Sequence, residues 1–232
     1  MNIDISIPKN DNETWKEAFE RFHAFCRVPF QMYDDEPETT TVLEFNRNVE
    51  LLIPGKRIPA ERLAELEAKY NVTIPMELKK FMQEHGSFTI KLYHGNDLDL
   101  LHFYNPADSA ELAPFLPEIK PFLMGLENNF TYEIKDDLLK CSMTQEQIDW
   151  FNNNCFFFGH IIYNDERWEY LYFDKQGNFS SLYFAVENVY STVKDHVLPA
   201  LEGITEPKDF NQIMSYAIDK VMEWLTEYIS EE

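Results

Sequence analysis

The sequence CFFFGHIIYNDERWEYLYFDKQGNFSSLYF, residues 155–184, is the most strongly β-forming stretch of the chain. Aromatic and β-branched residues fill it, and the polar groups at 164–166 and 174–178 interrupt it with turn-forming residues. Apolar runs of this length, separated by short polar turns, are typical of consecutive antiparallel strands joined by hairpins. The stretch therefore predicts three strands, at 156–162, 168–173 and 180–184.

Further elements extend this sheet upstream and cover it downstream. Residues 88–92 alternate apolar and polar side chains, and a turn at 94–97 leads to another strand. Apolar residues recur at helical spacing from 210 to 228, after Asp209 and Gln212, which are suited to cap a helix. We therefore predict an α+β fold, in which helices pack on one face of a central antiparallel sheet.

Residues 58–86 predict two helices joined by a short extended segment. Asn71 can adopt the left-handed conformation that ends a helix, and Pro75 keeps the preceding residue extended while it opens the next helix. We interpret residues 57–232 as one α+β domain and residues 1–56 as an N-terminal helical extension.

The N-terminal extension contains one well-marked helix. Thr14 and Glu17 have the spacing of a capping box, and the apolar residues that follow repeat at helical spacing. Because this apolar face would form a large exposed patch in water, we expect Trp15, Phe19 and Phe22 to be buried against the main domain.

No catalytic, cofactor-binding or metal-binding motif emerges from the sequence. No glycine-rich loop follows a strand, and the histidines, His94, His102 and His160 among them, lack metal-ligand spacing. The three cysteines lie far apart and have no neighbouring basic cluster, which favours reduced and buried thiols. We predict a protein without catalytic residues, without a cofactor and without a metal.

One enzymatic alternative stays open. A pair of carboxylates beside aromatic rings is the arrangement that cleaves glycosides, and Asp165, Glu166 and Glu169 lie close together beside Trp168. Turns favour aspartate for ordinary structural reasons, so we prefer a structural role for these acids.

The charge of the chain bears on its partner. The sequence has 20 lysines and arginines against 41 aspartates and glutamates, a formal net charge of −21. Such a field repels phosphate backbones and anionic lipids, and it attracts a basic protein, although acidic composition also serves solubility alone. No apolar run approaches the ~20 residues of a membrane span, and the first residues do not resemble a signal peptide. We expect a cytoplasmic protein that binds neither nucleic acid nor membrane.

Two turns are the candidate partner-binding positions. Hairpin tips are exposed, and here they combine acids with aromatic residues that can anchor a partner. The predicted partner-binding residues are Tyr93, Asp97, Asp165, Glu166 and Trp168.

The segment from Ile58-Pro59 to His85-Gly86 resembles the opening of the SUKH superfamily, in which a hydrophobic-Pro clamp joins two helices. Tyr70-Asn71-Val72-Thr73-Ile74-Pro75 provides the clamp here, and His85-Gly86 stands where the superfamily has Asn-Gly. Farther on, Phe157-Phe158-Gly159 and Tyr170–Asp174 are similar to its central hairpin. The resemblance covers roughly residues 56–232 and implies the same antiparallel sheet and C-terminal helix.

The superfamily includes fungal regulators of cell-wall glucan synthesis and many bacterial immunity proteins. The resemblance therefore implies a binding fold with no catalytic residues to carry over. We expect an immunity protein that neutralises a basic, nuclease-like toxin domain by protein–protein binding. A regulatory or scaffold protein of the fungal type is the alternative, and the oligomeric state is left open.

Overall fold

The computed structural model describes residues 7–30, 40–45, 53–94, 96–103, 143–164, 167–204 and 206–231. Its helices are α1 (Trp15–Phe25), α2 (Val42–Phe45), α3 (Ala60–Tyr70), α4 (Met76–Glu84), α8 (Gln145–Asn154), α9 (Val189–Thr192), α10 (Leu198–Leu201) and α11 (Phe210–Glu231), with a 3-10 turn η1 (Val186–Asn188) and a π-helical turn η2 (Val193–Val197). Its strands are β1 (Pro29–Phe30), β2 (Thr40–Thr41), β3 (Ile53–Pro54), β4 (Phe88–His94), β5 (Asn96–Phe103), β6 (Cys155–Asn164), β7 (Arg167–Asp174) and β8 (Phe179–Ala185).

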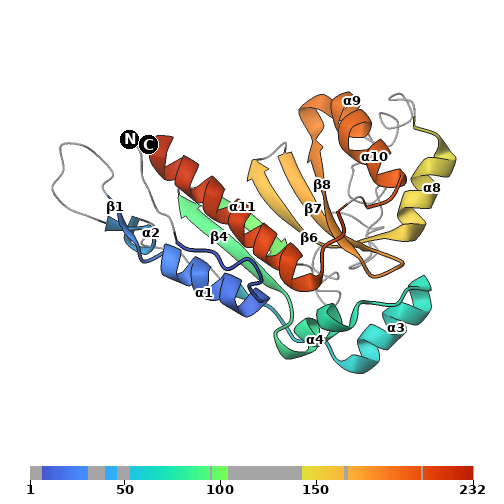
Figure 1. Cartoon of the computed structure of the whole chain (residues 1–232), viewed down its shortest axis with the longest axis horizontal. Coiled ribbons are helices and arrows are strands. Elements are labelled where there is room, and N and C mark those ends of the chain that lie inside the picture. Colours follow the sequence, from blue (N-terminus) through green and yellow to red (C-terminus); the bar gives the residue numbers. More distant parts are fainter. Residues whose placement is uncertain are drawn as a thin grey trace.

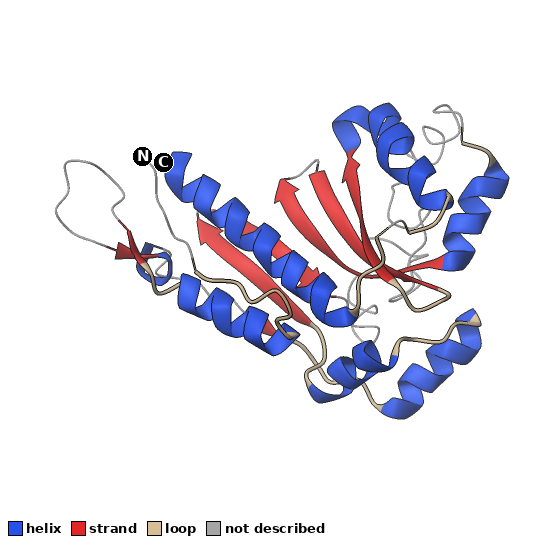
Figure 2. Ribbon diagram, viewed as in Figure 1, coloured by secondary structure: helices blue, strands red, loops and turns tan. Residues whose placement is uncertain are grey.

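The main sheet has the order β3-β4-β5-β6-β7-β8, and every neighbouring pair is antiparallel. The predicted α+β class is confirmed, and β4, β6, β7 and β8 contain the predicted strands (Figures 1 and 2). Turn chemistry shapes the β7–β8 hairpin, because the Asp174 carboxylate accepts hydrogen bonds from the backbone of Gln176 and Asn178. Gly177 follows the turn with φ +85°, a conformation that favours glycine.

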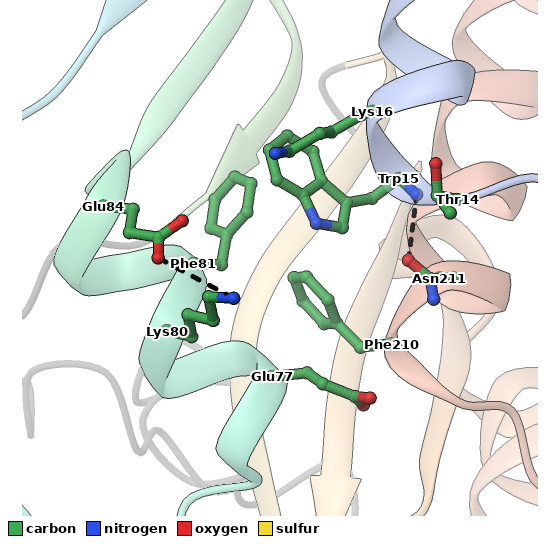
Figure 3. Close-up of a pocket in the computed structure, with 9 residues that line it drawn as sticks. All are labelled: Thr14, Trp15, Lys16, Glu77, Lys80, Phe81, Glu84, Phe210 and Asn211. Atoms are coloured by element: carbon green, nitrogen blue, oxygen red, sulfur yellow. Dashed lines mark hydrogen bonds and ion pairs between the residues drawn. The ribbon is translucent and has the colours of Figure 1, made fainter.

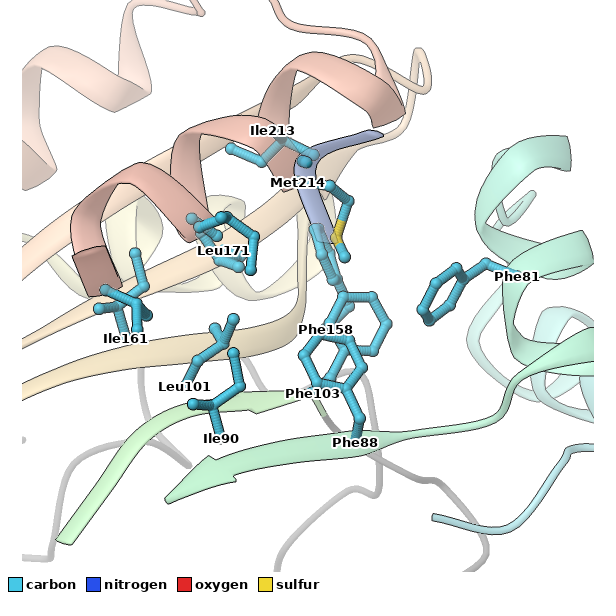
Figure 4. Close-up of a cluster of buried hydrophobic side chains, with 14 of the residues drawn as sticks. Phe81, Phe88, Ile90, Leu101, Phe103, Phe158, Ile161, Leu171, Ile213 and Met214 are labelled. Atoms are coloured by element: carbon cyan, nitrogen blue, oxygen red, sulfur yellow. The ribbon is translucent and has the colours of Figure 1, made fainter. Parts of the chain in front are cut away.

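One face of the sheet is covered by the long helix α11, beside which α1 lies (Figures 1 and 2). Figure 4 shows the core between α11 and the sheet, where Ile213 and Met214 of α11 lie above strand side chains that include Leu101 and Phe158. All four of these side chains are buried. The apolar stripe predicted from residue 210 onward is therefore the inner side of α11.

The other face carries a second core over β6, β7 and β8. Phe157, Tyr170, Tyr172 and Leu182 point to this side and pack with residues of α8 and η2. The prediction described helices on one face, and the structure adds this second helical cover. The second cover forms because successive residues of β6 and β7 are apolar, so that both faces of these strands are hydrophobic and both are buried.

The helix–clamp–helix segment forms as predicted, with α3 and α4 joined by residues 71–75. Asn71 has φ +50° and ends α3 in the left-handed conformation. The Glu67 carboxylate accepts a hydrogen bond from the Ile74 backbone at 2.7 Å and pairs with Lys79 at 2.7 Å. One side chain thereby connects α3, the clamp and α4.

Helix α1 packs on the main domain and shares its core. The capping box of Thr14 and Glu17 is present, and Phe22 is buried as predicted. Trp15 and Phe19 are only partly buried, but both pack against the same core cluster. The two rings are partly exposed because they lie at the margin of the interface between α1 and the main domain. There the Trp15 and Phe81 rings meet edge to face, with their centroids 4.9 Å apart.

A buried ion cluster joins the N-terminal segment to α11. The Arg21 guanidinium contacts both carboxylate oxygens of Glu13, at 2.5 and 2.9 Å, and reaches Asp219 of α11 at 2.7 Å. The Ser215 hydroxyl of α11 also donates to Glu13. Hydrogen bonds from Arg21 lower the pKa of Glu13 below its usual range. Both Glu13 and Arg21 are buried, so each depends on the other for compensation of its charge.

Within the described ranges, no helix is both long enough and apolar enough to cross a membrane.

Arg21→Met is expected to lower the free energy of unfolding by about 3–5 kcal/mol, because it leaves Glu13 buried without its counter-charge. Adding Glu13→Gln to this variant is expected to restore about 1 kcal/mol or more, because the amide is cheaper to bury. Urea unfolding of the full chain measures both effects. Arg62→Met is the matched control: its ion pair with Glu65 is exposed, and the expected change is under about 1 kcal/mol. A loss at position 21 no larger than this control would contradict the role of the cluster.

Candidate functional site

The two predicted turns lie at the same end of the sheet. Strands β4 and β6 both pair antiparallel with β5, so they run in the same direction and their hairpins lie at the same end of the sheet. We call this end of the sheet, defined by the described residues 93–94, 96–97, 164 and 167–168, the hairpin end. The topology therefore brings together two segments that lie about 70 residues apart in the sequence.

The structure describes the predicted partner-binding residues to different degrees. Tyr93 pairs with Asp97 across the β4–β5 hairpin, but their side chains lie outside the described part of the chain. Asp165 and Glu166 lie outside the described residues altogether. Trp168 of β7 is described: it is half-buried and packs against the second core cluster. The core cluster thus fixes one side of the Trp168 ring. Its role as an anchor for a partner stays a prediction.

Helix α11 adds a contribution that the sequence reasoning missed. The Trp224 indole donates a hydrogen bond to the carbonyl of Tyr163 at 2.9 Å, which places this part of α11 beside the β6–β7 hairpin. Trp224 stacks on Tyr228 with ring centroids 5.0 Å apart. Glu223 and Glu227 are exposed on the same part of the helix. The sequence did contain a signal for this surface, because two acids and two aromatic residues each recur there four positions apart, the spacing of neighbours on one side of a helix.

Glu169 lies beneath the hairpin end and serves the fold. It is buried, and its two carboxylate oxygens accept hydrogen bonds from the hydroxyls of Tyr163, at 2.7 Å, and Tyr216, at 2.5 Å. Burial and the neighbouring carboxylate raise the pKa of both tyrosines. Both oxygens are occupied by groups that the fold needs, which disfavours Glu169 as a catalytic acid or nucleophile. The carboxylate attaches β7 to β6 and α11.

The thiols and possible metal ligands show no sign of reactivity where they are described. Cys26 and Cys155 are buried, and burial raises the pKa of Cys26 to about 12 and that of Cys155 further still. Among the residues that the structure describes, no three His, Cys, Asp or Glu side chains gather as a metal site would require.

A shallow pocket of about 310 Å³ lies where α1, α4 and α11 meet. Figure 3 shows three aromatic rings facing into it, those of Trp15, Phe81 and Phe210. The Trp15 backbone donates to the Asn211 side chain at 2.9 Å, and charged side chains of both signs stand around the opening, namely Lys16, Glu77, Lys80 and Glu84. Apolar lining with a polar rim suits an amphipathic side chain of a partner better than a reaction that needs convergent acids and bases.

Two histidines that are distant in sequence meet across β5 and β6. His102 pairs with His160 in the ladder, and their rings stack with centroids 5.6 Å apart. Burial, followed by the proximity of His102, lowers the pKa of His160 to about 3. His160 is therefore neutral at physiological pH.

The model of the SMI1 / KNR4 family (SUKH-1) matches residues 57–206. The match begins just before α3 and ends before α11, so it includes the helix–clamp–helix segment and strands β4 to β8. Neither the search of curated proteins nor the search of solved structures found a significant match.

The His160 environment predicts how stability depends on pH. An unfolded histidine takes up a proton near its ordinary pKa of 6.5, whereas folded His160 resists protonation down to about 3. The unfolded state therefore binds more protons below about pH 6.5, and the free energy of unfolding falls there by up to about 1.4 kcal/mol per pH unit.

Urea unfolding at about pH 7 and about pH 5.5 measures this slope. His160→Gln is expected to reduce it, and His23→Gln, at an exposed position of α1, is the control that keeps it. An unchanged slope in the position-160 variant would show that His160 is not protected from protonation.

Proposed function

The chain belongs to the SMI1 / KNR4 family (SUKH-1), and we propose that it is a non-catalytic cytoplasmic protein that binds and neutralises a basic, nuclease-like toxin domain. Family membership is compatible with an immunity or a regulatory role, and it suggests protein–protein interaction in general. The choice of a basic toxin is the finer part of the proposal.

The observation that carries this choice is the net charge of −21 together with the composition of the hairpin end. Long-range attraction by an acidic surface accelerates the encounter with a basic partner, and aromatic anchors then slow its dissociation. Asp97, Asp165 and Glu166 are the acids of the two turns. Glu223 and Glu227 extend the acidic side chains along α11, next to the stacked ring of Trp224.

The local chemistry supports binding over catalysis. The Glu169 carboxylate, the acid that a glycosidase role would recruit, is engaged by two tyrosine hydroxyls. The described thiols have raised pKa values, which disfavours the thiolate that nucleophilic attack requires. We therefore expect no turnover of glycans, nucleic acids, esters or peptides.

Co-expression with a nuclease-like toxin domain, sought first among the genes beside this one, tests the proposal, with growth as the readout. The wild-type chain is expected to protect the cells, and association measured with purified proteins is expected to slow severalfold between about 20 and 150 mM salt. Asp165→Lys combined with Glu166→Lys is expected to reduce mainly the association rate, because exposed charges act on the encounter.

The matched control is Glu61→Lys combined with Glu65→Lys on α3. It changes the net charge equally, but α3 lies beside α4, which leads into the start of β4 at the end of the sheet opposite the hairpin end (Figure 1). An equal effect of the two double variants would assign the steering to total charge and not to the hairpin end. Absence of both protection and micromolar binding by the wild-type chain would contradict the immunity role and leave the regulatory one.

A further inference from the structure

The two edges of the main sheet differ in how they are protected. At one edge the described part of β3 has two residues, Ile53 and Pro54, and offers little backbone for further pairing. At the other edge β8 has seven residues, Phe179–Ala185, and pairs with β7 along its whole length without a bulge. Such an edge strand can template the addition of another strand unless its outward groups are covered.

Both ends of β8 are covered from within the chain. The backbone N–H and C=O of Phe179 exchange hydrogen bonds with Lys208, at 3.0 and 2.9 Å. At the other end the Thr192 hydroxyl accepts from the backbone N–H of Ala185, at 3.1 Å, and lies 3.3 Å from its carbonyl oxygen, to which it donates. These contacts show that Phe179 and Ala185 direct their backbone groups away from β7.

In the described part of the chain, the middle of β8 has no such cover. Because backbone groups alternate along a regular strand, Ser181 and Tyr183 also direct their N–H and C=O away from β7. Among the described residues, no hydrogen bond outside the sheet ladder involves these four groups. A stretch about three residues long, or roughly 10 Å, thus presents an unused ladder between two covered ends.

A groove of about 270 Å³ runs beside this open stretch. Ser180, Ser181, Leu182 and Tyr183 line one side, and residues of η2, α10 and the connection to α11 line the other.

The polar side chains of the groove differ in how far they are engaged. The Lys208 ammonium lies over the Tyr216 ring, 5.3 Å from its centroid, and the His196 ring packs on Tyr183 at 5.2 Å. The carboxylates of Asp195 and Glu206 are exposed, and no described residue forms an ion pair with them.

We propose that the open stretch of β8 receives an extended segment of a partner protein, which adds to the sheet as a further strand and places basic side chains near Asp195 and Glu206. Strand addition supplies the affinity through main-chain hydrogen bonds, and flanking side chains supply the selectivity. The basic character of the segment follows from the two unpaired carboxylates and the net charge of −21. This inference rests on the proposed function for the identity of the partner, but its geometry is independent of the hairpin end.

The test uses the full chain labelled with ¹⁵N and an acetylated, amidated peptide of sequence Lys-Thr-Val-Thr-Lys at up to about 2 mM. Binding is expected to shift the amide signals of Ser181 and Tyr183 and to slow their hydrogen exchange about tenfold at saturation. The Leu182 amide, which faces β7 already, is expected to change little.

Three controls separate strand addition from other binding. Ser181→Pro removes one outward N–H at an edge position that tolerates proline, and it is expected to weaken the peptide about tenfold. Ser181→Ala keeps the N–H and is expected to bind like wild type, although it loses the same side-chain hydrogen bond to Tyr216. The acidic peptide Glu-Thr-Val-Thr-Glu is expected to bind at least about tenfold more weakly, because it meets Asp195 and Glu206 with like charge.

Each contrary result has a definite meaning. Absence of shifts at 2 mM, equal binding of both peptides, or binding that the proline leaves unchanged would overturn the proposal. Protection of the Ser181 and Tyr183 amides in the free protein that grows with its concentration would assign the edge to a second copy of the chain and overturn it as well.

The toxin co-expression assay distinguishes this inference from the proposed function. If wild type and Ser181→Pro protect cells equally, the immunity role stands and the edge is not the docking site. If wild type fails to protect, the immunity role is lost, whereas the peptide titration still decides the inference about β8.

Discussion

Two buried carboxylates must find donors, and successive residues of α11 supply them. Ser215 donates to Glu13 of the N-terminal segment, and Tyr216 donates to Glu169 of β7. Neighbouring positions on a helix point about 100° apart, so one helix can face two partners at once. Helix α11 therefore packs on the sheet and, along its side, on α1, and its position is specified by polar contacts to both as well as by its apolar stripe. An uncompensated carboxylate in either place would cost several kcal/mol, which makes alternative positions of the helix unfavourable.

The same arrangement explains why we place the proposed binding surfaces at the margins of the sheet. One face of the sheet lies under α11 and α1, and the other face, over β6 to β8, lies under α8 and η2. Aromatic residues of β6 and β7 are thereby used as core on both sides, Phe158 on one and Phe157 on the other. In the described part of the chain, the margins offer a partner the hairpin end, the edge of β8 and the small pocket beside Trp15. We propose these three places for contact with another protein, a kind of interaction that membership of the family suggests in general.

The match to the family covers residues 57–206, so α1 and α11 both lie beyond it. These two helices nevertheless complete the main core and hold each other through Arg21 and Asp219. We interpret the N-terminal segment as an extension that is integrated into the domain through α11, because the ion cluster and the ring of Phe22 are buried with it. Its removal would expose apolar surface on α11 as well as the charge of Asp219.

Local signals in the sequence determined the α+β class, the positions of the four predicted strands, the capping box of α1 and the left-handed end of α3, because hydrophobic period and turn chemistry act over a few residues. Sequence also predicted the hairpin turns to be exposed acidic segments, but it could not show that the two hairpins share one end of the sheet, since strand order is a long-range property. Only the tertiary structure decided that Glu169 is a structural carboxylate and that His102 and His160 are neighbours. It also showed that no described residue pairs with the outward backbone groups in the middle of β8. Each of these features depends on contacts between residues that are distant in the chain, and a local sequence pattern does not predict such contacts. These long-range contacts form because they allow both faces of the sheet to be buried, and that burial depends on the packing of the whole core.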